Sequence, residues 1–189
     1  MGKIILARHG QDEDNARGIL NGRRDMPLTS LGVSQAYELA DKLKLSKLDI
    51  EYVFSSPYQR AEKTAKICSS FLDVPHVVLE CLVERNHGIL EGHPYSDIPR
   101  LAKAFREVHG MTYVLEVEGG EGYPELYERA TNALVEIREK ILELNIKRDV
   151  LIVSHGAIGR TMEAVHKGLG HERMFELTSP KNCEFRILE

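Results

Sequence analysis

The chain has 189 residues, of which 42% are hydrophobic and 29% charged, and its net charge is −4. A slightly acidic balance argues against a general nucleic-acid binder, and no apolar run approaches the ~20 residues that cross a membrane. Its three cysteines lie far apart without a Cys-x-x-Cys pair, which predicts free thiols in a reducing cytoplasm.

Strands and helices are expected to alternate along the chain. Short apolar runs predict buried strands at residues 3–7, 49–54, 77–79 and 149–153, with a final edge strand at 185–188. Helical spacing predicts helices at 30–45, about 57–71, 125–144 and 159–167, and one more near 98–109. The alternation predicts a three-layer α/β/α sandwich, in which helices cover both faces of a mostly parallel sheet. We expect a single domain over 1–189, with a short flap insertion over about 93–120.

Two of the predicted strands run directly into a histidine followed by a glycine. The stretches IILARHG and LIVSHG place His9 and His155 at strand ends, where open α/β sheets bind their ligands. Arg8 precedes the first histidine, and Arg60 lies in the first helical turn after another strand. Arginine binds phosphate oxygens in pairs, and the glycine after each histidine adds a backbone N–H donor. These residues predict a phosphate site in which a neutral imidazole can also act as a nucleophile.

Six blocks, in order along nearly the whole chain, resemble the histidine phosphatase superfamily, also called phosphoglycerate mutase-like. They are RHG at 8–10, a N…G..D.PLT..G..QA pattern over 15–36, SSPYQRAEKTA at 55–65, LVERNHGILEG at 82–92, GGEG at 119–122 and VSHG at 153–156. The resemblance implies an enzyme that transfers phosphoryl groups of a small phosphorylated substrate. It implies no metal and no other cofactor, no nucleic-acid partner and no membrane; the sequence indicates no oligomeric state.

The resemblance also implies a role for each matching residue. His9 is the implied nucleophile, which becomes phosphohistidine, and Glu84 is the implied general acid and later the base. Glu84 is chosen over its neighbours Glu80 and Glu91 from the L.E spacing, and a protonated Glu84 predicts an acid-to-neutral pH optimum. The implied phosphate contacts are Arg8, Asn15, Gly22, Arg60, His155 and Gly156.

Three features depart from the family pattern or lie outside it. Asp12 stands where the family commonly has serine or threonine, and it is expected to repel a phosphate dianion or to pair with Arg17 or Arg23. Gly122 replaces the serine of GGES, so a cap or supporting contact is expected to be missing. The histidines at 87, 93 and 109 match no metal-ligand spacing and are expected to be solvated loop residues.

Three functions fit these residues. The first is a phosphatase, in which water takes the phosphoryl group from His9. The second is a phosphoglycerate mutase dependent on 2,3-bisphosphoglycerate, and the third is a catalytically silent binding protein of the same fold. The segment 84–121 is short, whereas mutases of this family carry a longer insertion there, which favours the phosphatase. The flap is expected to roof the pocket and to set the choice of substrate.

Overall fold

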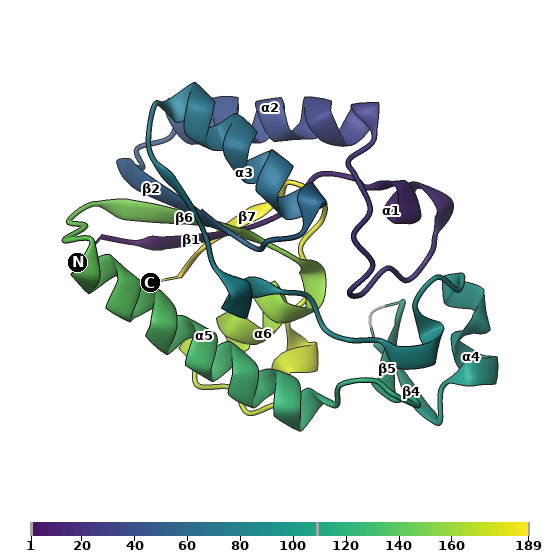
Figure 1. Ribbon diagram of the computed structural model, residues 1–189. Coiled ribbons are helices and arrows are strands. Elements are labelled where there is room, and N and C mark those ends of the chain that lie inside the picture. Colours follow the sequence, from purple (N-terminus) through teal and green to yellow (C-terminus); the bar gives the residue numbers. More distant parts are fainter. Residues whose placement is uncertain (1, 109, 189) are drawn as a thin grey trace.

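The computed structural model describes residues 2–108 and 110–188, and a five-stranded sheet forms its centre (Figure 1). The strands lie in the order β3-β2-β6-β1-β7. Their bounds are β1 (Ile4–Arg8), β2 (Ile50–Ser55), β3 (His76–Val78), β6 (Asp149–Ser154) and β7 (Phe185–Leu188). All neighbouring pairs are parallel except β1 with β7, which is antiparallel. The mostly parallel sheet and its late edge strand are therefore confirmed.

Helices cover both faces of the sheet, as predicted (Figure 1). The helices α2 (Ser30–Leu45) and α3 (Gln59–Leu72) lie on one face, and α5 (Tyr123–Glu143) and α6 (Gly156–His166) lie on the other. Alternate strand residues supply the two cores: Ile5 packs with α2 and α3, whereas Ile4 packs with α5 and α6. A strand buried on both faces must be apolar throughout, which explains the continuous hydrophobic runs in the sequence.

The segment between β3 and α5 differs from the prediction. The helix expected near 98–109 is wrong: α4 (Ile98–Leu101) is a single turn, and β4 (Ala104–Val108) then pairs antiparallel with β5 (Met111–Glu116). Gly110, with φ of 73°, lies between these two strands, and Val114 of β5 packs with Leu20 and Ile98 in a separate small core. Cross-strand pairing therefore overrides the helical spacing, and His109 lies outside the described residues.

Short elements complete the chain. The helix α1 (Glu13–Arg17), which the sequence analysis did not expect, is capped by the Asp12 side chain and ends at Gly18 with φ of 68°. Single 3-10 turns occur at η1 (Glu80–Leu82), η2 (Gly88–Leu90), η3 (Tyr95–Asp97) and η4 (Met174–Glu176). No helix in the described part of the chain has the length and apolar character needed to cross a bilayer.

Gly10 and Gly32 let the loop after β1 lie against the start of α2. A Cβ on Gly32 would overlap the backbone oxygen of Gln11, so the substitution requires a shift of backbone rather than of a flexible side chain. We expect Gly32→Ala to lower the free energy of unfolding by about 2–3 kcal/mol, measured by urea denaturation. Gly159→Ala is the matched control: this helical glycine has nothing within 4 Å of an added Cβ, so alanine should stabilise the protein by up to ~1 kcal/mol. Equal effects of both substitutions would contradict the close approach.

Candidate active site

The pairing of β1 with β6 brings the two histidines together. Arg8 lies opposite Ser154 in the parallel register, so the residues that follow, His9 and His155, leave the sheet at the same edge. Their ring centroids are 5.1 Å apart, at an interplanar angle of 63°. Both side chains are almost completely buried, with exposed fractions of 2% and 1%. The two strand ends therefore lie side by side, as the sequence analysis expected.

The hydrogen bond of His9 fixes which ring nitrogen is free. Nδ1 lies 2.7 Å from the carbonyl oxygen of Gly10, which can only accept, so Nδ1 carries the proton. The lone pair is then on Nε2. Burial lowers the pKa of His9 well below 6.5, and the positive charges of Arg60 and Arg8 lower it further. The imidazole is therefore neutral at physiological pH, the state that a nucleophile requires.

His155 is held between an arginine and a serine. Arg60 donates from Nε to Nδ1 of His155 over 3.2 Å, and a guanidinium has no acceptor atom. The proton of the imidazole must then be on Nε2, which donates to Oγ of Ser56 over 2.8 Å. Burial, followed by the charge of Arg60, lowers the pKa of His155 well below 6.5. This histidine is also neutral, and its two nitrogens are both occupied.

Arg60 is completely buried and anchored by backbone carbonyls. Its Nη1 donates to the oxygen of Arg24 over 2.6 Å, and its Nη2 donates to the oxygen of Gly22 over 2.8 Å. The segment 22–24 is thereby tied to α3. Gly22 thus contributes a carbonyl to Arg60, in addition to lining the cavity described below.

Asp12 is paired differently from the prediction. It caps α1 by accepting from the backbone N–H of Asn15 over 2.7 Å, which turns its carboxylate inward. Its Oδ2 lies 3.4 Å from Nε of Arg60 and 3.9 Å from Nδ1 of His9, and it accepts from the Asn21 side chain. Burial raises the pKa of this carboxyl.

The two arginines expected to pair with Asp12 lie elsewhere. Arg17 contacts Glu13 at 3.6 Å, and Arg23 approaches Glu121 at 4.0 Å. The predicted pairing of Asp12 with either one is therefore wrong, because the capping geometry points the carboxylate toward the sheet edge and away from the exposed arginines.

Asn15 orients Arg8. Its Oδ1 accepts from Nη2 of Arg8 over 3.3 Å and from Nδ2 of Asn182 over 3.0 Å. Nη1 of Arg8 donates to the carbonyl oxygen of Pro180 over 3.1 Å, whereas its buried Nε has no partner. Arg8 is thus fixed on one side of the guanidinium.

The side chain of Glu84 lies at the N-terminus of α6. Its carboxylate accepts from the backbone N–H groups of Ala157 and Ile158, both over 3.0 Å, and from that of Arg85 over 2.8 Å. These three N–H groups fix the position of the Glu84 carboxyl group at the N-terminus of α6. Of the three neighbouring glutamates, Glu84 alone lines the cavity; Glu80 is exposed, and Glu91 accepts from the backbone of Arg23 and His87.

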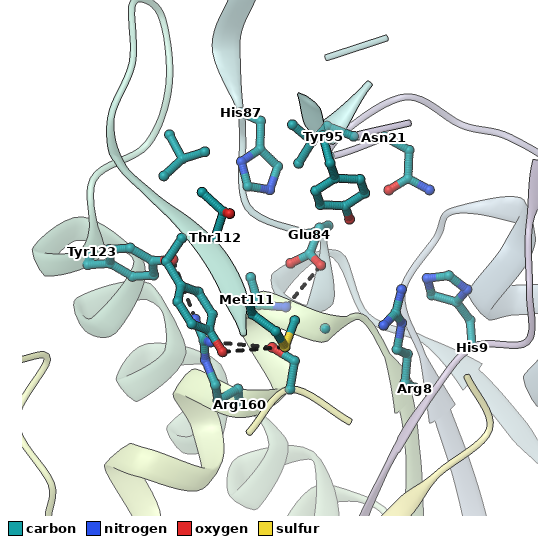
Figure 2. A pocket seen from close by; sticks show the side chains of 17 residues that line it. Arg8, His9, Asn21, Glu84, His87, Tyr95, Met111, Thr112, Tyr123 and Arg160 are labelled. Carbon is teal, nitrogen blue, oxygen red and sulfur yellow. Dashed lines mark hydrogen bonds between the residues drawn. The ribbon is translucent and has the colours of Figure 1, made fainter. Parts of the chain in front are cut away.

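A cavity of about 100 Å³ opens at this sheet edge (Figure 2). Of the predicted site residues, the cavity is lined by Arg8, His9, Gly22, Glu84 and Gly156. Three further predicted site residues do not line the cavity but contact the residues around it: Arg60, His155 and Asn15. Figure 2 shows Arg8 and His9 on one side, Glu84 near the middle, and Arg160 with Tyr123 on the far side.

The sequence analysis missed part of the cavity wall: His87, Tyr123, Arg160 and Ser179. His87 was expected to be solvated, and this is wrong: it lines the cavity, and its Nδ1 is buried without a partner. Burial and the charge of Arg85 lower the pKa of His87 to about 4. His93 contacts Asp97 at 3.0 Å. Among the described residues, no three His, Cys, Asp or Glu side chains are arranged to hold a metal ion.

The fold and the site together define an α/β protein with histidines and arginines gathered at the carboxyl edge of its sheet. The family model for the histidine phosphatase superfamily (branch 1) matches residues 4–189. A 2,3-bisphosphoglycerate-dependent phosphoglycerate mutase from Methylobacterium sp. is 30% identical over 173 residues, covering 89% of this chain and 82% of the mutase. The uncharacterized phosphatase PhoE of Bacillus subtilis is 31% identical over 157 residues, covering 83% and 73%.

A solved mycobacterial glucosyl-3-phosphoglycerate phosphatase shares the fold, with a TM-score of 0.82 at 21% identity, over 99% of this chain and 90% of that one. The chain therefore belongs to the histidine phosphatase superfamily, branch 1, as its six sequence blocks predicted. It is an enzyme of the histidine phosphatase type, and its relatives include both phosphatases and phosphoglycerate mutases.

Proposed function

We propose that this chain is a metal-independent phosphomonoester hydrolase that acts on a small phosphorylated metabolite through a phosphohistidine intermediate. The observation that carries the proposal is the state of His9: its Nε2 holds the free lone pair, and the ring lines a cavity shared with Arg8 and Glu84. Phosphoryl transfer mainly requires positioning and neutralisation of charge, and fixed guanidinium groups supply both.

The proposed reaction has two steps. Nε2 of His9 attacks phosphorus, the bond from phosphorus to the ester oxygen breaks, and protonated Glu84 gives its proton to the leaving oxygen. Ionised Glu84 then takes a proton from water, whose oxygen attacks phosphorus as the P–N bond breaks. Inorganic phosphate leaves, and His9 returns to the neutral state. Arg8 contacts the phosphoryl group, and Asn15 orients Arg8. Arg60 and His155, which are hydrogen-bonded to each other outside the cavity lining, support the residues that line it.

The second candidate is a phosphoglycerate mutase, because a curated mutase is among the similar chains. It would require 2,3-bisphosphoglycerate to maintain the phosphorylated enzyme. The phosphatase is favoured because the segment from Glu84 to Glu121 is short: its described residues, 84–108 and 110–121, form α4, two 3-10 turns and one hairpin. A catalytically silent binding protein is the third candidate, but the complete set of a neutral histidine, arginines and an acid argues against it.

One assay separates these candidates. The protein is incubated with p-nitrophenyl phosphate in EDTA, and in parallel with 3-phosphoglycerate and 2,3-bisphosphoglycerate. We expect phosphate release that EDTA does not reduce. Formation of 2-phosphoglycerate with little phosphate release would favour the mutase. If a well-folded protein does neither, the binding protein is the better description.

Substitution of Glu84 is expected to depend on the leaving group. Glu84→Gln should lower kcat/KM for an alkyl phosphate, such as β-glycerophosphate, by about 10²–10³-fold, since the alkoxide needs a proton as it leaves. The loss on p-nitrophenyl phosphate should be about tenfold or less, because p-nitrophenolate leaves without protonation. Glu80→Gln is the control, an exposed neighbour on η1. Equal losses on both substrates would show that Glu84 is not the acid.

A further inference from the structure

The far end of the cavity contains a buried arginine that the proposed reaction does not use. Arg160 is on α6, one and a half turns beyond His155, and its side chain is only 1% exposed. It lines the cavity on the side away from His9, near Tyr123 (Figure 2). Ser179 also lines the cavity.

This guanidinium has no carboxylate partner. Its Nη1 donates to Oγ of Ser179 over 3.3 Å, its Nη2 donates to the hydroxyl of Tyr123 over 3.4 Å, and its buried Nε has no acceptor. Both hydrogen bonds are long and both acceptors are neutral. No Asp or Glu oxygen lies within 4.0 Å of Arg160 in the stretches 2–108 and 110–188. Two other arginines of the site region are buried: Arg60 lies 3.4 Å from Asp12, and Arg85 donates to the backbone oxygens of Glu121 and Val114.

Aromatic rings account for only part of the environment of Arg160. Its guanidinium carbon lies 4.3 Å from the ring centroid of Tyr113 and 5.5 Å from that of Phe175. Such contacts stabilise a cation by less than a charged partner does, and a buried cation without an anion is costly. A second guanidinium, that of Arg85, lies 4.0 Å from the Tyr123 ring, which adds positive charge to the same wall. The far end of the cavity is therefore short of negative charge.

We propose that Arg160, with the hydroxyls of Tyr123 and Ser179, forms a second anion subsite that binds a carboxylate of the substrate. The inference rests on the proposed function: the phosphoryl group lies at Arg8 and His9, and the carboxylate lies at the opposite end of the same cavity. One guanidinium flanked by neutral hydroxyls matches a single negative charge, and its fork geometry matches a carboxylate. The substrate class is then a small phosphorylated carboxylic acid.

O-phosphoserine and O-phosphoethanolamine test the subsite, because these two phosphate esters differ only in the carboxylate. Wild-type enzyme should hydrolyse O-phosphoserine with a kcat/KM at least about tenfold above that for O-phosphoethanolamine, as expected for one charge-assisted hydrogen-bond pair. Arg160→Gln should reduce this ratio to nearly 1, through loss of activity on O-phosphoserine. Its kcat/KM for O-phosphoethanolamine and p-nitrophenyl phosphate should stay within about threefold of wild type. Arg160→Lys should keep part of the preference.

Arg106→Gln is the matched control, since this exposed arginine lies 5.9 Å from the Phe175 ring and does not line the cavity. It should leave the ratio unchanged. The proposal is overturned if wild type shows no preference for O-phosphoserine, if the preference survives in Arg160→Gln, or if that variant loses activity equally on all three esters. The last result would indicate a purely structural arginine.

A binding measurement keeps the subsite testable apart from turnover. Calorimetric titration of His9→Ala with both esters should show the same preference, and His9→Ala/Arg160→Gln should lose it. If p-nitrophenyl phosphate is not hydrolysed by wild type, the proposed hydrolase fails, yet the binding ratio still decides the subsite. Equal affinities for both esters in His9→Ala would overturn the subsite even if hydrolysis is observed.

Discussion

His9→Ala is expected to reduce kcat/KM for p-nitrophenyl phosphate by at least about 10⁴-fold, the scale typical of removing an attacking side chain. The physical reason is that the variant has no group to replace the lone pair of Nε2, and the alternative, direct attack by water, would need a base positioned on the same line. His155 does not substitute, because its Nδ1 accepts from Arg60 and its Nε2 donates to Ser56. Steady-state kinetics in EDTA measures the loss.

The control for this substitution is His93→Ala. His93 is a histidine of the flap, pairs with Asp97 and does not line the cavity. It should retain nearly full activity on p-nitrophenyl phosphate. Rapid quenching of wild type with ³²P-labelled substrate should also trap a phosphoenzyme that is labile in acid and stable in alkali. Retained activity or a persistent phosphoenzyme in His9→Ala would place the nucleophile elsewhere.

The sheet and its site edge could be predicted because local sequence carried the signal. The strands β1 and β6 are apolar runs that lead directly into His9 and His155, and β2 leads into α3, the helix that carries Arg60. Parallel strands place their carboxyl ends at one edge, so the meeting of His9 and His155 follows from topology alone.

The far wall of the cavity could not be predicted in the same way. Arg160 follows His155 on a mostly buried helix, and nothing in its spacing distinguishes a cavity-lining arginine from a surface one. The hairpin of β4 and β5 was missed because its ladder forms between residues whose local spacing also fits a helix. The inward turn of Asp12 depends on capping α1, a helix of one turn that periodicity does not detect.

The two buried histidines also make the protein sensitive to acid. In the native state the pKa values of His9 and His155 are held well below 6.5, mainly by burial and then by the charges of the arginines. Histidines in the unfolded chain titrate near ~6.5. Below that pH the unfolded chain binds two protons that the native protein does not. The stability that both groups contribute is therefore complete above pH ~6.5 and is lost as the pH falls, at about 2.7 kcal/mol per pH unit. His87, with a pKa of about 4, adds to the loss in the same direction.

A single substitution isolates one of these protons. Urea denaturation in phosphate-free buffer from pH 7.5 to pH 5 should give a slope of unfolding free energy against pH that, below pH ~6, is smaller in His9→Asn than in wild type by about 1.4 kcal/mol per pH unit. The difference between variants is the useful quantity, because Asp12, whose pKa burial raises, acts on the raw slope in the opposite sense. Identical slopes for His9→Asn and wild type would mean that His9 takes up its proton at the same pH in the native and the unfolded chain, so that burial does not keep this imidazole neutral below pH ~6.5.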